Sequence, residues 1–293
     1  MQCARATSSQ ALLIERLASG TSTASYDAHW GFGQVSIARA LDECFARLAD
    51  TEVIMFGIHQ CNHIGRLGHY ADLAAERGLV SILTVNGTGP GYGVAPFGGR
   101  EGRLGTNPIA FGAPTKGNPI VVDFATSSVP EGKVRFLRET GQQLPELTLV
   151  NERGEYSTNP SDLYAADGTA AGAILPFGGP LGYKSYGISL MVQILSSLLG
   201  APAWAEDNEY TGSNNLFVLA LRIESFMSPD EFQQQLEEMA AYVTSSQPGV
   251  ASTGVRLPGE LEFERMEERR RTGIPLPSEV WSTLESLAAG RGT

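Results

Sequence analysis

The order of helical and extended patterns early in the chain constrains the fold most. Apolar residues recur at helical spacing over Gln34–Asp50, and the short apolar run VIMFGI follows at Val53–Ile58. The pair then repeats, because Arg66–Arg77 has one apolar face and the run LVSILTV follows at Leu79–Val85. Short apolar runs that alternate with helical periodicity are typical of buried strands separated by helices. This segment therefore predicts an α/β fold.

The remainder of the chain extends this pattern with one long interruption. Glycine and proline are dense from Gly87 to Pro119, which predicts a long irregular connection of the kind that is usually functional or disordered. The sequence SPDE makes Ser228 the N-cap of a helix, with proline at the first helical position. Further strands are predicted at Pro119–Ser127 and Asn214–Ile223, and further helices at Glu131–Glu139, Lys184–Leu199 and Ser278–Ala289.

Charge and cysteine content exclude several classes of protein. The 293 residues carry a formal net charge of −11, whereas a nucleic-acid-binding protein normally presents a basic face. The three cysteines, Cys3, Cys44 and Cys61, have no regular spacing and indicate a reducing compartment. The N-terminus has no signal-peptide pattern, and the apolar core of the charge-free run Ser185–Ala205 is short of the roughly 20 residues that span a membrane. We therefore expect a cytoplasmic protein that binds neither nucleic acid nor membrane.

Two glycine-rich segments come close to nucleotide-binding signatures without matching them. In GGPLGYKS (Gly178–Ser185), Tyr183 separates the second glycine from the lysine, whereas a phosphate-binding loop needs them adjacent. The segment GTGPGYG (Gly87–Gly93) lacks the glycine spacing of the dinucleotide fingerprint. The sequence therefore does not support a Rossmann fold.

The stretch HQCNHIGRLGH (His59–His69) holds three of the four histidines. His59, Cys61 and His63 could share one face of a strand and bind a metal, but no HExxH motif and no second cysteine pair complete such a site. All three histidines could instead be structural or solvated.

A third interpretation makes His63 alone an acid/base group. His63 lies in the turn after an apolar strand, and α/β proteins bind ligands at the carboxyl ends of strands. An imidazole titrates near neutral pH, which suits proton transfer to or from a hydroxyl or carbonyl oxygen. In this interpretation Asn62 orients His63, and the amides of Gly65–Gly68 meet an anionic group. Spacing alone does not choose among the three interpretations.

Five segments occur in a fixed order along the chain, and together they are more specific than any one. They are NHIGRLGHYADLAAERGLVSI, VAPFGGREGRLGTNPIAF, VVDFATS, GYKSYGISLMVQIL, and VRLPGE followed by RRRTGIPL. In this order they resemble the malate/L-lactate dehydrogenase family, which also contains L-sulfolactate, ureidoglycolate and 2-hydroxycarboxylate dehydrogenases and Δ1-piperideine-2-carboxylate reductases. The resemblance runs from about Gly31 to the C-terminus.

The resemblance implies a fold, an activity and a division of the chain. The implied fold is the α/β fold of the L-sulfolactate dehydrogenases, a mixed sheet with flanking helices that is unrelated to the Rossmann fold. The implied activity is that of a cytoplasmic homodimer dependent on NAD or NADP. Residues 34–214 would form the core that binds cofactor and substrate. Residues 1–33 and 215–293 would form the remainder of a second subdomain.

The resemblance also assigns residues. His63 matches the acid/base histidine, and no metal ligand is assigned. The cofactor site would comprise Gly65, Arg66, Leu67, Gly68, Asp123, Phe124, Ala125, Thr126, Ser127, Tyr183, Lys184, Pro258, Gly259 and Glu260, and the substrate site Thr106 and Arg66. His59, Cys61 and His69 match no functional position.

The residues alone leave some of these roles open. Asp123–Ser127 could be an ordinary strand-to-helix turn, and Lys184 a solvated residue at a helix start. Arginine suits bidentate pairing with a substrate carboxylate, although most arginines are surface charges. The candidates for that role are Arg66, Arg100, Arg103 and Arg256.

Two departures from the family pattern bear on activity. The family motif D-S-H-G on an N-terminal helix has no match here, so we expect that the chain lacks this helical segment. Tyr183 stands where the family commonly has histidine. Apart from these departures, the resemblance implies hydride transfer between NAD(P) and C2 of a small 2-hydroxy or 2-oxo acid. The alternatives are reduction of a cyclic imine and a non-catalytic, degenerate homologue.

Overall fold

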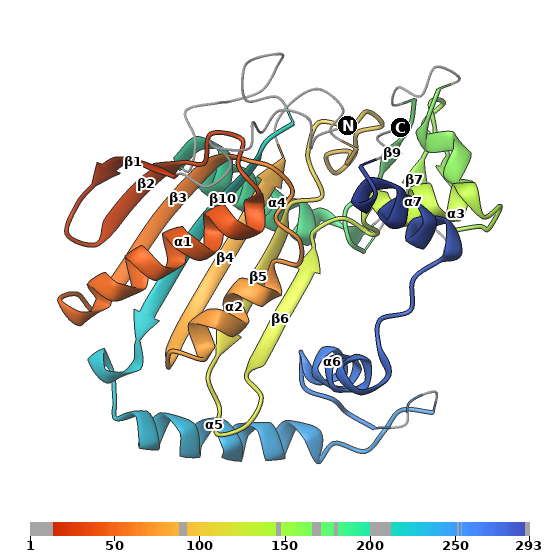
Figure 1. The fold of residues 1–293 in the computed structure, drawn as a ribbon. Helices are drawn as coiled ribbons and strands as arrows, with labels where there is room; N and C mark the ends of the chain where they lie inside the picture. Colours follow the sequence, from red (N-terminus) through yellow and green to blue (C-terminus); the bar gives the residue numbers. More distant parts are fainter. Residues whose placement is uncertain are drawn as a thin grey trace.

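A seven-stranded mixed sheet forms the centre of the molecule (Figure 1). The computed structural model describes residues 14–87, 93–144, 148–165, 171–178, 181–199, 212–250, 252 and 254–290. The strands lie in the order β1 (Glu15–Ser19), β2 (Thr23–Asp27), β3 (Val53–Cys61), β10 (Asn214–Arg222), β4 (Leu79–Gly87), β5 (Pro108–Ala113) and β6 (Ile120–Ala125). This confirms the predicted mixed sheet.

Strand directions decide which loops meet. The pair β2–β3 is parallel and every other neighbouring pair is antiparallel. As a result β2, β3, β4 and β6 all run the same way, and their carboxyl ends form one edge of the sheet, the upper edge in Figure 1. We call this the carboxyl edge. The loops that enter β5 and β10 begin at the same edge, because those two strands run in the opposite direction.

Helices cover the two faces of the sheet differently. On one face α1 (Gly33–Ala46) packs on β3, and α2 (Gly68–Ala75) packs on β4, β5 and β6. Behind the sheet in Figure 1 lies α4 (Tyr183–Gln193), which continues as a π-helical segment (Ile194–Leu199). Because side chains alternate along a strand, Leu83 of β4 joins the apolar core under α1 and α2, whereas Thr84 hydrogen-bonds Ser196 of the π-helical segment.

A smaller unit adjoins the carboxyl edge. It contains the three-stranded sheet of β8 (Tyr156–Ser157), β7 (Leu149–Val150) and β9 (Ala173–Ile174), together with α3 (Glu131–Glu139). It has an apolar cluster of its own, formed by Val94, Leu104, Val129, Val134, Leu137, Leu144, Leu149, Leu163 and Ile174. The loop that leaves β6 therefore connects the large sheet to this second core.

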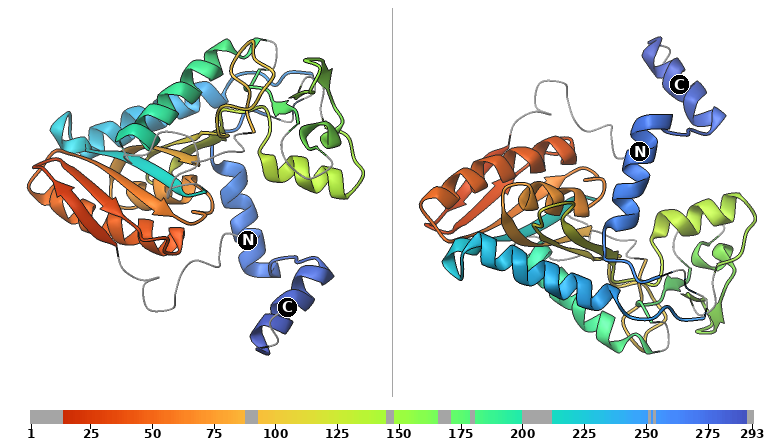
Figure 2. Two further views of the ribbon diagram at one scale, coloured as in Figure 1. Left: turned by 90° about the horizontal axis from the view of Figure 1, so that it is seen from above. Right: turned by 90° about the horizontal axis from the view of Figure 1, so that it is seen from below.

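The C-terminal third crosses the molecule and then projects from it. After β10, α5 (Pro229–Thr244) begins at Ser228, whose hydroxyl accepts a hydrogen bond from the Glu231 amide, as the SPDE pattern predicted. The chain continues into α6 (Glu260–Thr272) and α7 (Ser278–Ala288), which Figure 2 shows extending away from the sheet. None of the residues of α7 is buried.

One predicted loop was wrong. The glycine- and proline-rich stretch from Gly87 to Pro119 contains β5, whose six residues PIAFGA pair with β4 on one side and β6 on the other. Proline is tolerated there because Pro108 is the first residue of the strand. Residues 88–92 of that stretch lie outside the described residues. The strands β1 and β2 and the helix α6 were also not predicted.

The predicted boundary after residue 214 falls at the first residue of β10, which lies between β3 and β4 in the sheet. The division into two subdomains stays a prediction.

In the part of the chain that the structure describes, no helix is long and apolar enough to cross a membrane.

Candidate functional site

The carboxyl edge brings together predicted site residues that lie far apart in the sequence. His63 follows β3, Asp123 lies near the end of β6, and Thr106 precedes β5. The start of α4 reaches the same region through the hydrogen bonds described below, whereas the segment 257–260 lies against the amino half of β6. The edge of an α/β sheet formed by carboxyl ends is where such proteins commonly bind ligands.

His63 is exposed on a backbone that its neighbours fix. The chain leaves β3 at the buried Cys61 and Asn62, and His63 then emerges into solvent. Asn62 donates its side-chain amide to the carbonyls of Trp30 and Gly31. These hydrogen bonds tie the end of β3 to the turn after β2 and do not orient the His63 imidazole, in contrast to the prediction from the sequence. Downstream, Tyr70 donates its hydroxyl to the Ile64 carbonyl at 2.5 Å. The structure thus presents the His63 ring from a well-anchored loop.

The turn after His63 is tied to β6. The Gly68 amide, at the start of α2, donates to Oδ2 of Asp123 at 2.8 Å. A Cβ built on Gly68 would lie 2.9 Å from that same oxygen, so only glycine fits without a shift. Arg66 approaches Asp123 at 3.7 Å and Asp72 at 3.1 Å. The carboxylate of Asp123 is thus the anionic group that the Gly68 amide meets.

The Asp123 carboxylate is partly shielded from solvent. Burial raises the pKa of its carboxyl above the ordinary value of 3.8, and the Gly68 hydrogen bond and Arg66 oppose that rise. A carboxyl with a raised pKa at a ligand-binding edge is a common feature of functional sites, although structural ion pairs produce it too. Asp123 therefore has a structural partner whatever else it binds.

Thr126 and Ser127 join β6 to the loop before β5. The Thr126 amide donates to the Thr106 carbonyl at 3.0 Å, and the Thr126 hydroxyl donates to the carbonyls of Thr106 and Asn107. The Ser127 hydroxyl donates to the Val129 carbonyl at 2.9 Å. Both side chains are buried, and their hydroxyls bond backbone carbonyls of the protein, so they hold the loop at the carboxyl edge in place. Thr106, in that loop, is half-buried.

The start of α4 is anchored to the same place. Ser185 donates its hydroxyl to the Phe177 carbonyl at 2.5 Å, and the Phe177 amide donates to the Thr126 carbonyl at 2.8 Å. This chain of bonds fixes where α4 begins. Tyr183 and Lys184 are exposed there, and the Tyr183 ring meets Phe97 edge-on with centroids 6.1 Å apart.

The Pro258–Glu260 stretch lies against the amino half of β6. The Val121 amide donates to the Pro258 carbonyl at 3.1 Å. Gly259 has φ of 97°, a left-handed conformation that favours glycine, and it packs against Val121 and Phe263. This predicted cofactor-site stretch is therefore held beside β6.

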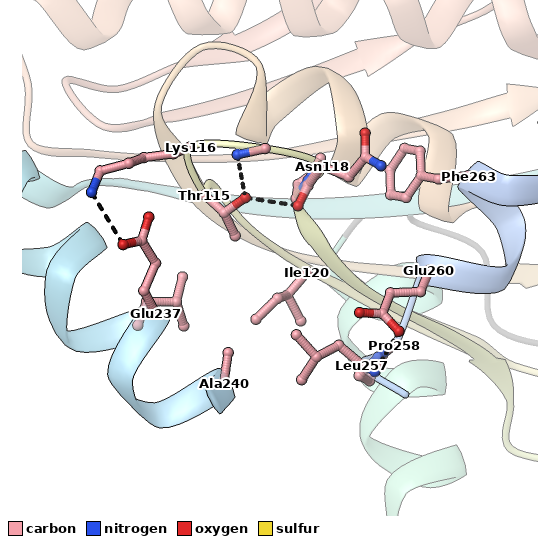
Figure 3. A pocket seen from close by; sticks show the side chains of 13 residues that line it. Thr115, Lys116, Asn118, Ile120, Glu237, Ala240, Leu257, Pro258, Glu260 and Phe263 are labelled. Carbon is pink, nitrogen blue, oxygen red and sulfur yellow. Dashed lines mark hydrogen bonds and ion pairs between the residues drawn. The ribbon is translucent and has the colours of Figure 1, made fainter. Parts of the chain in front are cut away.

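A pocket of about 340 Å³ opens on the far side of that stretch (Figure 3). Its walls come from the β5–β6 connection, α5 and the start of α6, and Lys116 and Glu237 form an ion pair of 3.1 Å across it. Pro258 and Glu260 line it, but His63, Asp123 and Lys184 do not. The pocket therefore lies at the opposite end of β6 from the residues expected to react.

A buried amide network supports the carboxyl edge from behind, and sequence reasoning missed it. Asn86 of β4 donates to Asn107 at 2.8 Å and to Gln193 of α4 at 2.7 Å. Asn107 donates to Gln193 at 3.1 Å and to the Ser189 carbonyl at 3.0 Å. The one signal in the sequence is a glutamine inside the apolar run LMVQIL, where an unpaired amide would be costly.

The other histidines and arginines of the candidate set have different surroundings. His59 is buried, and that burial lowers the pKa of its imidazole below 6.5, with Asp27 opposing the shift. His69 is exposed on α2, with its ring tilted against Tyr70. Arg103 pairs with Glu101, and Arg256 pairs with Glu264 at 2.6 Å. Among the residues that the structure describes, no cluster of His, Cys, Asp and Glu could hold a metal ion.

Comparison with known proteins identifies a family for the chain. A family model described as malate/L-lactate dehydrogenase matches residues 7–285. A malate dehydrogenase of Pyrococcus abyssi is 35% identical over 283 residues, covering 94% of this chain and 76% of the relative. Among solved structures, malate dehydrogenase from Pyrococcus horikoshii matches with a TM-score of 0.81 and 32% identity, over 96% of this chain and 77% of that one.

A second solved structure carries the name of the predicted fold. Sulfolactate dehydrogenase from Methanocaldococcus jannaschii matches with a TM-score of 0.78 and 29% identity, over 95% of this chain and 78% of that one. The fold expected from the five sequence segments is thereby confirmed.

Proposed function

Because the chain belongs to the malate/L-lactate dehydrogenase family and is therefore a hydroxyacid oxidoreductase, we propose that it transfers a hydride between NAD or NADP and C2 of a small 2-hydroxy or 2-oxo acid. The observation that carries the site assignment is the exposed His63, presented on a fixed backbone at the carboxyl edge of the sheet. Malate, lactate and related hydroxycarboxylates are the substrate class.

His63 is the proposed acid/base group. During oxidation of the alcohol, an imidazole nitrogen of His63 takes the hydroxyl proton while the C2 hydride leaves the substrate. During reduction the same nitrogen returns the proton to the carbonyl oxygen. The nicotinamide, when bound, accepts or supplies the hydride. Imidazole serves as a general base in its neutral form and as a general acid in its protonated form, so one side chain can act in both directions.

The exposed groups at the start of α4 fit a phosphate-bearing cofactor. Lys184 is exposed and, in the ranges that the structure describes, makes no ion pair, so its charge is available to a phosphate. The N-terminus of α4 has no side-chain cap, which leaves its first amides for a ligand. Together with the turn at Gly65–Gly68 and the strand end at Asp123–Ser127, these groups form the proposed cofactor site.

Arg66 and Thr106 are the proposed substrate ligands. Arg66 is exposed at the mouth of the loop that carries His63, and its guanidinium contacts Asp72 and Asp123. A substrate carboxylate would compete for that guanidinium or share it. The Thr106 carbonyl accepts hydrogen bonds from the amide and the hydroxyl of Thr126, so the Thr106 backbone has a fixed position at the edge.

A cyclic imine is the alternative substrate. The same geometry would deliver the His63 proton to an imine nitrogen in place of a carbonyl oxygen. A non-catalytic homologue is the alternative from another class.

Fluorescence titration with NADH and NADPH, followed by addition of 2-oxo acids, tests the proposal. We expect quenching or enhancement that saturates with one of the two nucleotides, then oxidation of that nucleotide on adding pyruvate, oxaloacetate or hydroxypyruvate. Turnover with Δ1-piperideine-2-carboxylate alone would favour the imine. Binding of neither nucleotide would indicate the non-catalytic homologue and contradict the proposal.

We also propose a cytoplasmic homodimer. Two exposed apolar surfaces support dimerisation. The first, on α4 and its π-helical continuation, comprises Leu190, Met191, Ile194, Leu198 and Leu199. The second, on α7, comprises Val280, Trp281, Leu284 and Leu287. Exposed apolar stripes of this extent commonly mark protein interfaces. Light scattering after size-exclusion chromatography should give about twice the 31.3 kDa of one chain, and a monomer would contradict the proposal. The buried thiols of Cys44 and Cys61 suit a reducing compartment.

A further inference from the structure

Backbone of an unusual conformation surrounds the strand end that leads to His63. Among the described residues, four that are not glycine have a left-handed backbone, and three of them lie here. They are His29 with φ of 47°, Trp30 with φ of 59° and Gln60 with φ of 52°. Such residues persist only where their surroundings hold them, and they gather at functional sites.

Gln60 forms a bulge in β3. Cys61 pairs with Asn214 and Ile58 pairs with Leu216, so His59 and Gln60 together oppose the single residue Asn215. Bulges next to active sites re-aim the side chains that follow them. Without the extra residue, the alternation of β3 would send the residues after it to the opposite faces of the sheet.

Asp27, the last residue of β2, holds both left-handed segments. Its Oδ1 accepts the His29 amide at 2.6 Å. With the Gln60 amide oriented so that both groups are satisfied, Gln60 Nε2 donates to Oδ1 of Asp27 at 3.0 Å. One carboxylate therefore connects the turn after β2 with the bulge in β3.

The turn after β2 and the bulge in β3 together fix the backbone of His63. The Trp30 amide donates to the Gln60 carbonyl at 2.8 Å, and Asn62 donates its side-chain amide to the Trp30 and Gly31 carbonyls. A Cβ built on Gly33 would lie 2.7 Å from the His63 carbonyl oxygen, so the first residue of α1 presses directly on this peptide.

We propose that Asp27 is a positioning residue for His63. It acts through Gln60 and the 28–31 turn, whose left-handed conformations set the direction in which the His63 backbone leaves the sheet. The inference rests on the proposed function in one respect, namely that His63 transfers the proton. A displacement of about 1 Å of a reacting group can cost about a hundredfold in rate.

Substitutions at Gln60 test the backbone conformation without removing a charge. Gln60→Gly should keep kcat within about threefold, because glycine adopts positive φ without a steric cost. Gln60→Val should lower kcat by about 10- to 100-fold, because a β-branched residue disfavours positive φ and the bulge would rearrange. The KM for the nucleotide should change little in either variant.

Asp27→Ala should lower kcat by a similar factor of about 10 to 100 and raise the solvent deuterium isotope effect on kcat, since proton transfer becomes slower. Adding Gln60→Gly to Asp27→Ala should recover part of kcat. The matched control is Asp42→Ala, which removes an aspartate that pairs with Arg77 at the surface of α1. Activity is expressed per nucleotide-binding site, so partial unfolding does not count as lost turnover.

Three outcomes separate the inference from the proposed function. If His63→Ala is inactive while Asp27→Ala and Gln60→Val keep wild-type kcat and isotope effect per site, the positioning role is wrong and the proposed function stands. If His63→Ala has full turnover, the acid/base assignment fails and the positioning role fails with it. If the wild-type protein turns over no substrate, amide exchange decides. The Trp30 and Asn62 amides should then exchange faster in Asp27→Ala than in Asp42→Ala, and equal rates would overturn the inference.

Discussion

The two halves of the carboxyl edge are held by different kinds of interaction. Around His63, an incompletely buried carboxylate and left-handed backbone fix a loop whose functional side chain faces solvent. Around Thr106 and α4, neutral amides and hydroxyls with almost no exposure bond one another across three elements. The first arrangement aims one group, whereas the second forms a rigid support. Variants that weaken one half should therefore affect chemistry, and variants that weaken the other should affect stability.

The largest expected effect is on turnover. His63→Ala should lower kcat by about 10²- to 10⁴-fold, the usual contribution of a positioned acid/base group, and leave nucleotide affinity near normal. Steady-state kinetics with the preferred 2-oxo acid would measure it. His69→Ala is the control, because His69 is exposed six residues further along, on α2, and has no proposed role. Equal turnover in the two variants would remove His63 from the mechanism.

The next effect is on stability in the other half. Asn107→Ala should lower the free energy of unfolding by about 3 kcal/mol, since it leaves buried amides unpaired and places alanine at positive φ. Asn107 has φ of 41°. Asn107→Gly keeps that conformation and should cost less than Asn107→Ala. Urea denaturation of both variants would measure the difference, and equal losses would show that the backbone conformation contributes nothing.

A smaller effect is expected on cofactor affinity. Lys184→Met should raise the Kd for the nucleotide by about 10- to 100-fold, since a hydrogen bond to a charged group contributes about 1.5–3 kcal/mol. The Tm of the free protein should stay the same, because Lys184 is exposed. Lys133→Met on α3 is the matched control for loss of one positive charge. Unchanged affinity would place the phosphate elsewhere.

The smallest effect concerns the link between the two halves. Burial raises the pKa of Asp123 above 3.8, so the folded state binds the proton more tightly than the unfolded state. This tighter proton binding adds to the free energy of unfolding below pH 3.8, and the added stability is lost as pH rises through the pKa of the folded state. Asp123→Asn cannot titrate but can still accept from the Gly68 amide. Its stability relative to wild type should therefore increase as pH rises above 3.8, measured by urea denaturation at several pH values. A pH-independent difference would contradict the raised pKa.

The local sequence predicted much of the secondary structure. Helical periodicity located α1 and α2, short apolar runs located β3 and β4, and the SPDE pattern placed the start of α5 after Ser228. The helix predicted at Glu131–Glu139 is α3. These elements have strong local signals, either an apolar face or a capping residue. The strand β5 was missed because PIAFGA lies among glycines and prolines, and it is a strand only because β4 and β6 pair with it on both sides. Tertiary pairing thus overrode a local preference for loop.

The candidate site divides in the same way. The sequence by itself determined the family, through five segments in a fixed order, and determined that His63 follows a strand end. Only the tertiary structure decided that Gly68 bonds Asp123, that Thr126 holds Thr106, and that Asp27 bonds Gln60. These contacts depend on strand order and direction, which place residues 20 to 55 positions apart within hydrogen-bond distance. A one-dimensional pattern carries the identity of each group, but the distances between groups arise only when the sheet forms.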